Sequence, residues 1–245
     1  MTSRETTGLL PRAAPGARHR RSASDWAWVV GLGAVQWPWL LRSLRGGSKT
    51  AKRALLDRLV LPHDALPNLG SWKADTGLLA LIVDHIEAHR PQTVVEFGSG
   101  ATSLVIAQAL KLHGGGALHS YDQHADFVTA TQGWLANHGL DADMRHAPLG
   151  DPAPGWPGCW YAADRLPERI DLLVVDGPPW TIHPLTRGSA ESVFTRLAPG
   201  GTVMLDDAAR LGERLVARRW RRKWPSFDFR LVHAGTKGTL MGVKR

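Results

Sequence analysis

The segment TVVEFGSGATS (residues 93–103) decides the fold. Its first five residues are mostly β-branched or aromatic and predict a short buried strand over residues 93–97. Gly98 and Gly100 follow at once, and two glycines one residue apart let the backbone turn sharply and approach a ligand closely. A helix beginning directly after this turn would offer free backbone N–H groups to the same ligand. The segment therefore predicts a strand, a binding turn and a helix in succession.

Short apolar strands and helices continue to alternate along the chain. Further strands are expected at residues 117–122, 142–146, 170–176 and 201–206. Helices are expected at residues 76–89, 103–112, 125–138, 189–197 and 211–223. Residues 227–232 and 239–244, joined by a glycine-containing turn, predict an antiparallel pair at the sheet edge. The pattern predicts an α/β fold, a doubly wound, mostly parallel seven-stranded sheet covered by helices on both faces.

The composition is that of a folded chain of enzyme size. Its 245 residues are 43% hydrophobic and 21% charged, which predicts one main domain with an extension and excludes a fibrous or largely disordered protein. The single cysteine, Cys159, excludes an intrachain disulfide framework and a cysteine-cluster metal site. The absence of disulfides fits the reducing cytoplasm, which is the expected location. The formal net charge of +8 is concentrated near the N-terminus and in residues 210–223, so we expect an acidic partner surface.

The N-terminal residues differ in character from the rest. Residues 1–25 are expected to be a disordered basic arm, and residues 26–61 a Trp-rich apolar segment with a helical extension. The main domain is expected over residues 62–245. The apolar run at 26–41 is too short to cross a bilayer, which needs about 20 apolar residues. We expect it either to contact a membrane peripherally, flanked by arginines, or to pack on the domain or on a partner.

Acidic residues end the expected strands. They are Glu96, Asp122, Asp176, Asp206 and Asp207. In a doubly wound sheet, ligands bind outside the carboxyl ends of the strands, so these side chains mark the expected site. A carboxylate two residues before the glycine turn would repel a pyrophosphate but suits a ligand carrying an ammonium and a sulfonium group. Ser103 also stands where a dinucleotide-binding turn has its third glycine, which argues against a nicotinamide cofactor.

Four motifs resemble those of class I S-adenosylmethionine-dependent methyltransferases. They are VVEFGSGATS, SYDQ, IDLLVVDGPP and LAPGGTVMLDDA, in the family's order across roughly residues 76–244. The strings HAPL, WY, VDGPP and LDDAAR also resemble a bacterial subgroup of the methyltransferase-24 type. The resemblance implies that residues 62–245 form a methyltransferase domain that binds S-adenosyl-L-methionine.

The resemblance also assigns the donor site. It implies that Glu96, Gly98 and Gly100 contact the methionine part of the donor, and that Ser99 and Thr102 belong to the same binding turn. By the same resemblance, Asp122 binds the ribose, His146 falls near the adenine, and Asp176 faces the methyl group. A histidine at position 146 departs from the acidic or amide residue that family members often carry there.

Two residues are candidates for catalysis, and three for a metal site. Asp176 could orient the acceptor or remove its proton, and His183, in the following loop, is a second candidate base. Catechol-type O-methyltransferases hold Mg²⁺ with an Asp at this strand end and an Asp-Asn pair after the fifth strand. Asp176, Asp206 and Asp207 resemble that pattern, with Asp in place of Asn. Three converging carboxylates would repel one another without a cation, which favours a divalent ion. Alternatively, Asp206 or Asp207 caps the following helix.

The sequence thus predicts methyl transfer to an oxygen or nitrogen nucleophile of a small molecule or glycan. One alternative is an NAD-dependent oxidoreductase with a similar sheet. Another is a non-catalytic adaptor tethered to a membrane or nucleic acid through its basic segments. Arginines on the helix at 211–223 form a solvated basic face or, as the sharper hypothesis, contact phosphates. They are Arg214, Arg218, Arg221 and Arg222.

Overall fold

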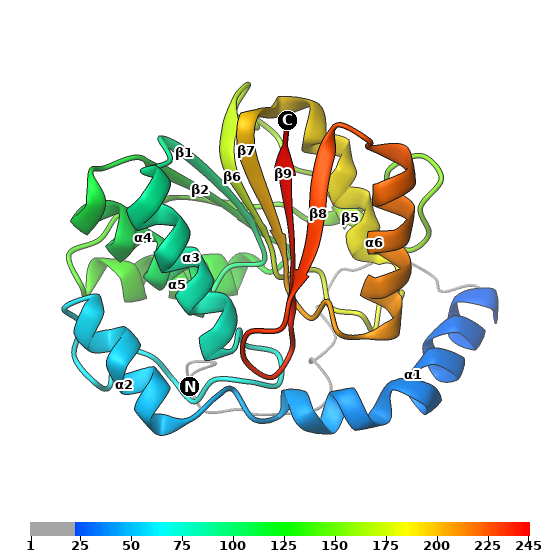
Figure 1. The fold of residues 1–245 in the computed structure, drawn as a ribbon, viewed down its shortest axis with the longest axis horizontal. Coiled ribbons are helices and arrows are strands. Elements are labelled where there is room, and N and C mark those ends of the chain that lie inside the picture. Colours follow the sequence, from blue (N-terminus) through cyan, green and yellow to red (C-terminus); the bar gives the residue numbers. More distant parts are fainter. Residues whose placement is uncertain (1–22) are drawn as a thin grey trace.

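A seven-stranded sheet in the order β3-β2-β1-β6-β7-β9-β8 forms the centre of the molecule (Figure 1). The structure, a computed structural model, describes residues 23–245. Five strands run parallel: β1 (Thr93–Phe97), β2 (Ala117–Asp122), β3 (Asp143–His146), β6 (Ile170–Val175) and β7 (Leu197–Leu205). The strands β8 (Phe227–Val232) and β9 (Thr239–Lys244) are antiparallel and complete one edge. The predicted fold class is confirmed.

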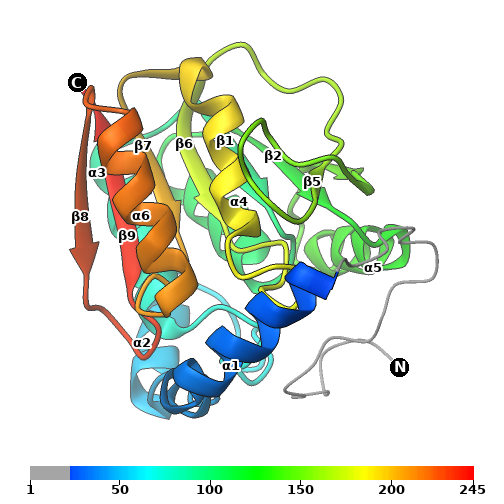
Figure 2. The ribbon, with the colours of Figure 1, turned by 90° about the vertical axis from the view of Figure 1, so that its right-hand side faces the viewer.

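Helices cover both faces of this sheet (Figures 1 and 2). On one face lie α3 (Thr76–His89), α4 (Ala101–His113) and α5 (Ala125–Ala136). On the other lie the 3₁₀ helix η1 (Thr186–Arg196) and α6 (Leu211–Lys223). Because β-strand side chains alternate between faces, Val94 belongs to the core on the side of α3 and α4, and Val95 to the core on the side of η1 and α6. The central parallel strands are therefore buried on both sides, as their continuous apolar sequences predict.

Two further helices of the described chain precede α3. The helix α2 (Lys49–Arg58) packs against α3, and Leu56 is fully buried in the same core as α3 and α4. The helix α1 (Ala23–Ser43) runs continuously through Pro38 and lies across the end of the molecule where the loop after β6 emerges (Figure 2). Its Trp28 ring lies 5.9 Å from the His183 ring of that loop. The basic arm expected at residues 1–25 lies, up to residue 22, outside the described residues.

The exposed side of α1 carries an apolar stripe. Trp26, Val30, Trp37 and Leu41 are each at least half exposed, and their spacing of four, seven and four residues places them on one helical face. Arg42 and Arg45 lie at the end of this stripe and are also exposed. Within residues 23–245, no helix is long and apolar enough to cross a membrane.

Several elements differ from the sequence-based expectation. The helix expected at residues 189–197 is η1, a 3₁₀ helix that begins three residues earlier, and residue 197 already belongs to β7. The Gly188 carbonyl accepts a hydrogen bond from the Trp220 indole at 3.0 Å, a long-range contact that no local pattern reveals. A small antiparallel pair, β4 (Leu149–Gly150) with β5 (Trp160–Tyr161), was not expected, because strands of two residues leave no periodic signal.

Candidate functional site

The candidate site lies where the sheet topology reverses, between β1 and β6. From β1 the chain continues outward to β2 and β3, and it then returns to add β6 on the other side of β1. The Phe97 carbonyl accepts hydrogen bonds from the Asp176 and Gly177 N–H groups, both at 2.9 Å. Gly98 has φ of +96°, and a Cβ atom there would lie 2.7 Å from the Gly177 nitrogen. Glycine is therefore required where the two loops meet, at the position where such sheets bind ligands.

A buried carboxyl group supports the glycine turn from inside. The Gly100 N–H donates to Ser103 Oγ at 2.9 Å, and this hydroxyl donates to Glu96 Oε2 at 2.5 Å. The Ser120 hydroxyl donates to the same oxygen at 2.6 Å. Glu96 is 0% exposed, and burial raises its pKa to about 7, although hydrogen bonds from the hydroxyls act in the opposite direction. In this structure Glu96 holds the turn through Ser103 and does not present its carboxyl group at the surface.

Asp122 lies beside the glycine turn at the end of β2. Its Oδ2 accepts the Ser99 N–H at 3.1 Å, and its Oδ1 accepts the His124 N–H at 2.9 Å. Burial raises the pKa of this carboxyl group, and the backbone hydrogen bonds act against that shift. A carboxylate has about four lone-pair sites, so two remain for a ligand. His146 pairs with Asp122 across the β2–β3 register and is exposed, with Nε2 3.2 Å from the Gln123 carbonyl.

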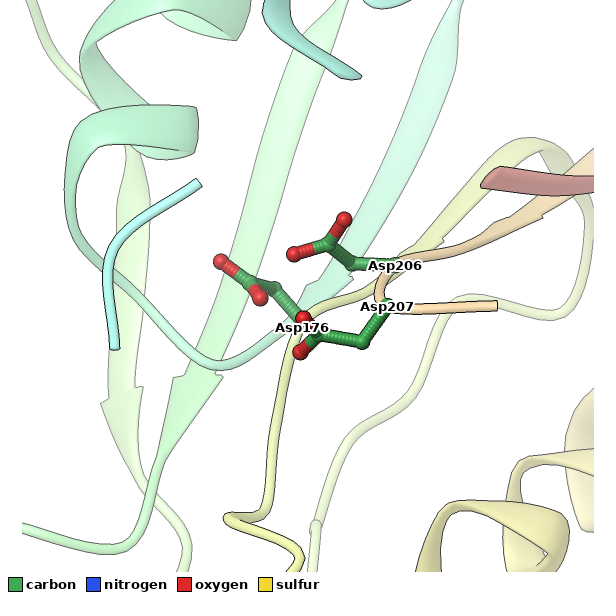
Figure 3. A group of neighbouring side chains, drawn as sticks. All are labelled: Asp176, Asp206 and Asp207. Atoms are coloured by element: carbon green, nitrogen blue, oxygen red, sulfur yellow. The ribbon is translucent and has the colours of Figure 1, made fainter. Parts of the chain in front are cut away.

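Three carboxyl groups meet at the ends of β6 and β7. Asp176, Asp206 and Asp207 each offer one oxygen, and these oxygens lie within 4.8 Å of one another (Figure 3). We call these three residues the acid cluster. Burial, followed by repulsion from Asp206, raises the pKa of Asp176 well above its usual range. The convergence expected from the sequence is thus present in the structure.

Three cationic side chains reach into the acid cluster. Arg187 Nη1 lies 3.1 Å from Asp207 Oδ2, and Arg210 pairs with the same oxygen. Lys237 Nζ lies 3.3 Å from Asp206 Oδ2 and 3.4 Å from Asp207 Oδ1. Burial alone would raise the pKa of Asp207, but these positive charges outweigh it and hold the pKa well below its usual range. The cluster is therefore charge-compensated from within the chain.

The loop after β6 lies under α1. His183 is 1% exposed, and its Nδ1 accepts the Leu185 N–H at 3.1 Å. The Trp180 ring also lies against α1, since a Cβ atom added at Gly33 would be 3.4 Å from it. The structure thus buries His183 beside the Trp28 ring, and its Nδ1 accepts a backbone hydrogen bond.

Sequence reasoning missed two residues of this region. Tyr161, in β5, stacks on Phe97 with ring centroids 5.3 Å apart, and its buried hydroxyl group has no hydrogen-bond partner among the described residues. Lys237 lies in the β8–β9 turn between Gly235 and Gly238. The two glycines predicted the turn from the sequence but gave no role to Lys237. A signal for Lys237 existed, because a turn at the end of an antiparallel strand beside β7 must lie near the carboxyl end of β7.

Comparisons with known proteins agree with this topology. Residues 95–208 match the methyltransferase-24 family, described as a methyltransferase domain. A methyltransferase from Geobacter sulfurreducens has a similar structure, with a TM-score of 0.52, 20% identity, and coverage of 80% of this chain and 87% of that one. The search of curated proteins gave no match.

Two O-methyltransferases are also similar in structure. TomG from Streptomyces achromogenes, involved in tomaymycin synthesis and in complex with SAM, has a TM-score of 0.53 and 13% identity, covering 91% of this chain and 99% of that one. The enzyme from Bacillus cereus, in complex with SAH, has a TM-score of 0.55 and 12% identity, covering 90% and 100%. The family match identifies a methyltransferase domain over residues 95–208, and the sheet with its site at the topological reversal is the fold of the S-adenosylmethionine-dependent methyltransferases to which the chain is similar.

The burial of Glu96 predicts a pH dependence of stability. Its folded-state pKa of about 7 lies above the ordinary 4.5, so the contribution of Glu96 to stability is full below about pH 4.5 and is lost as pH rises through 7. Glu96→Gln keeps a neutral side chain of similar shape. Between about pH 5 and pH 8, the free energy of unfolding of the wild type should fall relative to this variant by up to about 3 kcal/mol, at 1.36 kcal/mol per pKa unit.

Urea denaturation at several pH values measures this difference. Glu168→Gln, at an exposed position, is the matched control and should follow the wild type. If Glu96→Gln and the wild type have parallel pH profiles, the carboxyl group of Glu96 is already ionised in the folded protein at low pH, contrary to its burial.

Proposed function

We propose that this chain transfers the methyl group of S-adenosyl-L-methionine, bound between the glycine turn and Asp122, to a hydroxyl oxygen of a small molecule or glycan. The observation that carries the proposal is the contact of the Gly98 turn with the loop after β6, with Asp122 and Asp176 on either side. The two similar structures of O-methyltransferases support an oxygen acceptor over a nitrogen acceptor.

The residues present fit the donor. The two lone-pair sites left on Asp122 suit a pair of ribose hydroxyl groups, and His146 lies across the strand pair, on the side assigned to the adenine. The backbone around Gly98, Ser99, Gly100 and Thr102 would hold the methionine part, with Glu96 fixing the turn from beneath. The Tyr161 hydroxyl group and Asp176 Oδ1 are buried and have no hydrogen-bond partner among residues 23–245, so we expect them to contact the reactants bound in the same region.

We assign proton acceptance to Asp176. The acceptor oxygen would form a bond to the methyl carbon as the bond from carbon to sulfur breaks, and the hydroxyl proton would pass to the Asp176 carboxylate. A pKa raised by burial and by Asp206 makes this carboxylate a stronger base. His183 is less suited, because its Nδ1 accepts a backbone N–H and its ring packs near Trp28. Alignment of the two reactants and exclusion of water would supply the remaining rate acceleration.

We also propose that the apolar stripe of α1 contacts an anionic membrane surface. Tryptophan side chains favour the interface between lipid and water, and the stripe is free of charged residues from Trp26 to Leu41. Arg42 and Arg45, at the end of the stripe, would meet anionic headgroups. The uncharged stripe and the adjacent arginines together favour lipid over nucleic acid as the partner.

The donor site predicts the effect of Asp122→Ala on binding of S-adenosylhomocysteine. Two charge-assisted hydrogen bonds to the ribose would be lost, so affinity should fall about 10- to 100-fold by calorimetric titration. Asp141→Ala, which removes an exposed carboxylate just before β3, should leave the affinity unchanged. Equal affinities for Asp122→Ala and the wild type would place the donor elsewhere.

The proton-transfer role predicts that Asp176→Asn lowers the methyl-transfer rate by about 100-fold or more while the affinity for S-adenosylhomocysteine changes little. A panel of hydroxyl compounds, followed by release of S-adenosylhomocysteine, provides the assay. His183→Gln is the comparison, and we expect a much smaller loss of turnover. A larger loss in His183→Gln than in Asp176→Asn would reverse the assignment.

The membrane proposal predicts that the wild type floats with phosphatidylcholine vesicles containing phosphatidylserine and much less with phosphatidylcholine alone. Replacing Trp26 and Trp37 together by serine should lower the partition coefficient about tenfold or more. Leu112→Ser changes an exposed apolar residue of α4 and serves as the control. Flotation that is unaffected by the two tryptophan substitutions would assign binding to another segment.

A further inference from the structure

Lys237 is a buried cation in contact with two members of the acid cluster. Its side chain is 1% exposed, and its Nζ lies 3.3 Å from Asp206 Oδ2 and 3.4 Å from Asp207 Oδ1. Burial opposes its protonation, but attraction to Asp206 and Asp207 raises its pKa above the usual value. Lys237 is therefore charged, and its ammonium group lies where oxygen atoms from neighbouring strand ends converge.

The acid cluster fits a divalent cation poorly. Two of its oxygens, Asp176 Oδ1 and Asp206 Oδ1, have no hydrogen-bond partner in the part of the chain that the structure describes and would suit such an ion, although Arg187 Nη2 lies 3.9 Å from the first. Asp207, however, is already bound on both oxygens, by Lys237 on Oδ1 and by Arg187 and Arg210 on Oδ2. Mg²⁺ also keeps several water ligands, whereas Asp206 is 0% exposed. An ammonium group so close would repel a second cation.

Backbone contacts fix the position of Lys237. Asp75, which caps α3 by accepting the Leu78 N–H at 2.9 Å, also accepts the Lys237 N–H at 3.0 Å. The Ala209 N–H donates to the Lys237 carbonyl at 3.0 Å. The turn that carries Lys237 is thus attached both to the start of α3 and to the segment after β7. Such attachment indicates a built position for the ammonium group and not a chance contact of a flexible side chain.

We infer that Lys237 is the resident cation of this site: its ammonium group takes the place of a divalent metal ion, neutralises Asp206 and Asp207, and leaves Asp176 as the single carboxyl group directed to the acceptor. The last part rests on the proposed function. Asp176 is the most exposed of the three side chains, at 11% against 0% for Asp206 and 6% for Asp207. The acceptor therefore needs one hydroxyl group that can approach a carboxylate, and chelation by a diol has no role in its binding.

The test measures Mn²⁺ binding to the full chain by electron paramagnetic resonance, with S-adenosylhomocysteine present. The wild type and Lys237→Arg, which keeps the positive charge, should not bind Mn²⁺ at the acid cluster. Lys237→Ala removes the ammonium group and should bind Mn²⁺ at least about tenfold more tightly than either. Adding Asp206→Asn to Lys237→Ala should abolish this gain.

Each other outcome has a definite meaning. Mn²⁺ binding by the wild type that Asp206→Asn removes would overturn the inference, as would a folded Lys237→Ala that gains no affinity. If Lys237→Ala does not fold, Lys237→Met combined with Asp206→Asn, which deletes both charges of the pair, should restore folding, and its failure to do so would count against the pairing. Calorimetric titration of the wild type with S-adenosylhomocysteine tests the proposed function separately, because the donor contacts Asp122 and the glycine turn and none of the Lys237 contacts.

Discussion

The hydrogen bonds from Asp176 and Gly177 to the Phe97 carbonyl are the contact on which the site depends. They continue the pairing of β1 with β6 one step past the strand ends, so that the two loops leave the sheet together and not apart. The absence of a Cβ atom at Gly98 allows this approach. With the loops joined, Asp122 on one side and Asp176 on the other are held at fixed positions by a rigid sheet, as a precise reaction geometry requires.

Burying so many acidic groups at one sheet edge requires internal compensation, and the chain uses two different means. Glu96 has no cationic partner within residues 23–245, and burial raises its pKa to about 7 against the lowering effect of the neutral hydroxyl donors. Asp206 and Asp207 instead pair with lysine and arginine side chains. The first means suits a support beneath a backbone turn, and the second offsets the negative charges next to Asp176, whose pKa is raised by burial and then by Asp206.

Local patterns predicted much of the fold. The elements at 76–89, 93–97, 117–122, 211–223, 227–232 and 239–244 have the expected bounds, since apolar periodicity and flanking Gly or Pro act over short distances. The convergence of Asp176, Asp206 and Asp207 could also be predicted, because carboxyl ends of parallel strands meet at one edge. The partners of these carboxyl groups could not. Lys237 reaches them through strand pairing and through its contact with Asp75, which lies 162 positions earlier. A long-range hydrogen bond from Trp220 likewise meets η1 at Gly188.

The contact between Asp75 and Lys237 also bears on the order in which the chain folds. A ribosome makes Asp176, Asp206, Asp207 and the two arginines that pair with Asp207 before it makes Lys237, so the counterion of Asp206 arrives last. Until the last hairpin docks beside β7, burying these carboxylates is unfavourable, and the sheet edge stays open to water and to chaperones. Closure of the long loop between Asp75 and Lys237 is then a late step of folding. Only a chain that has completed this step has its buried carboxyl groups paired with Lys237.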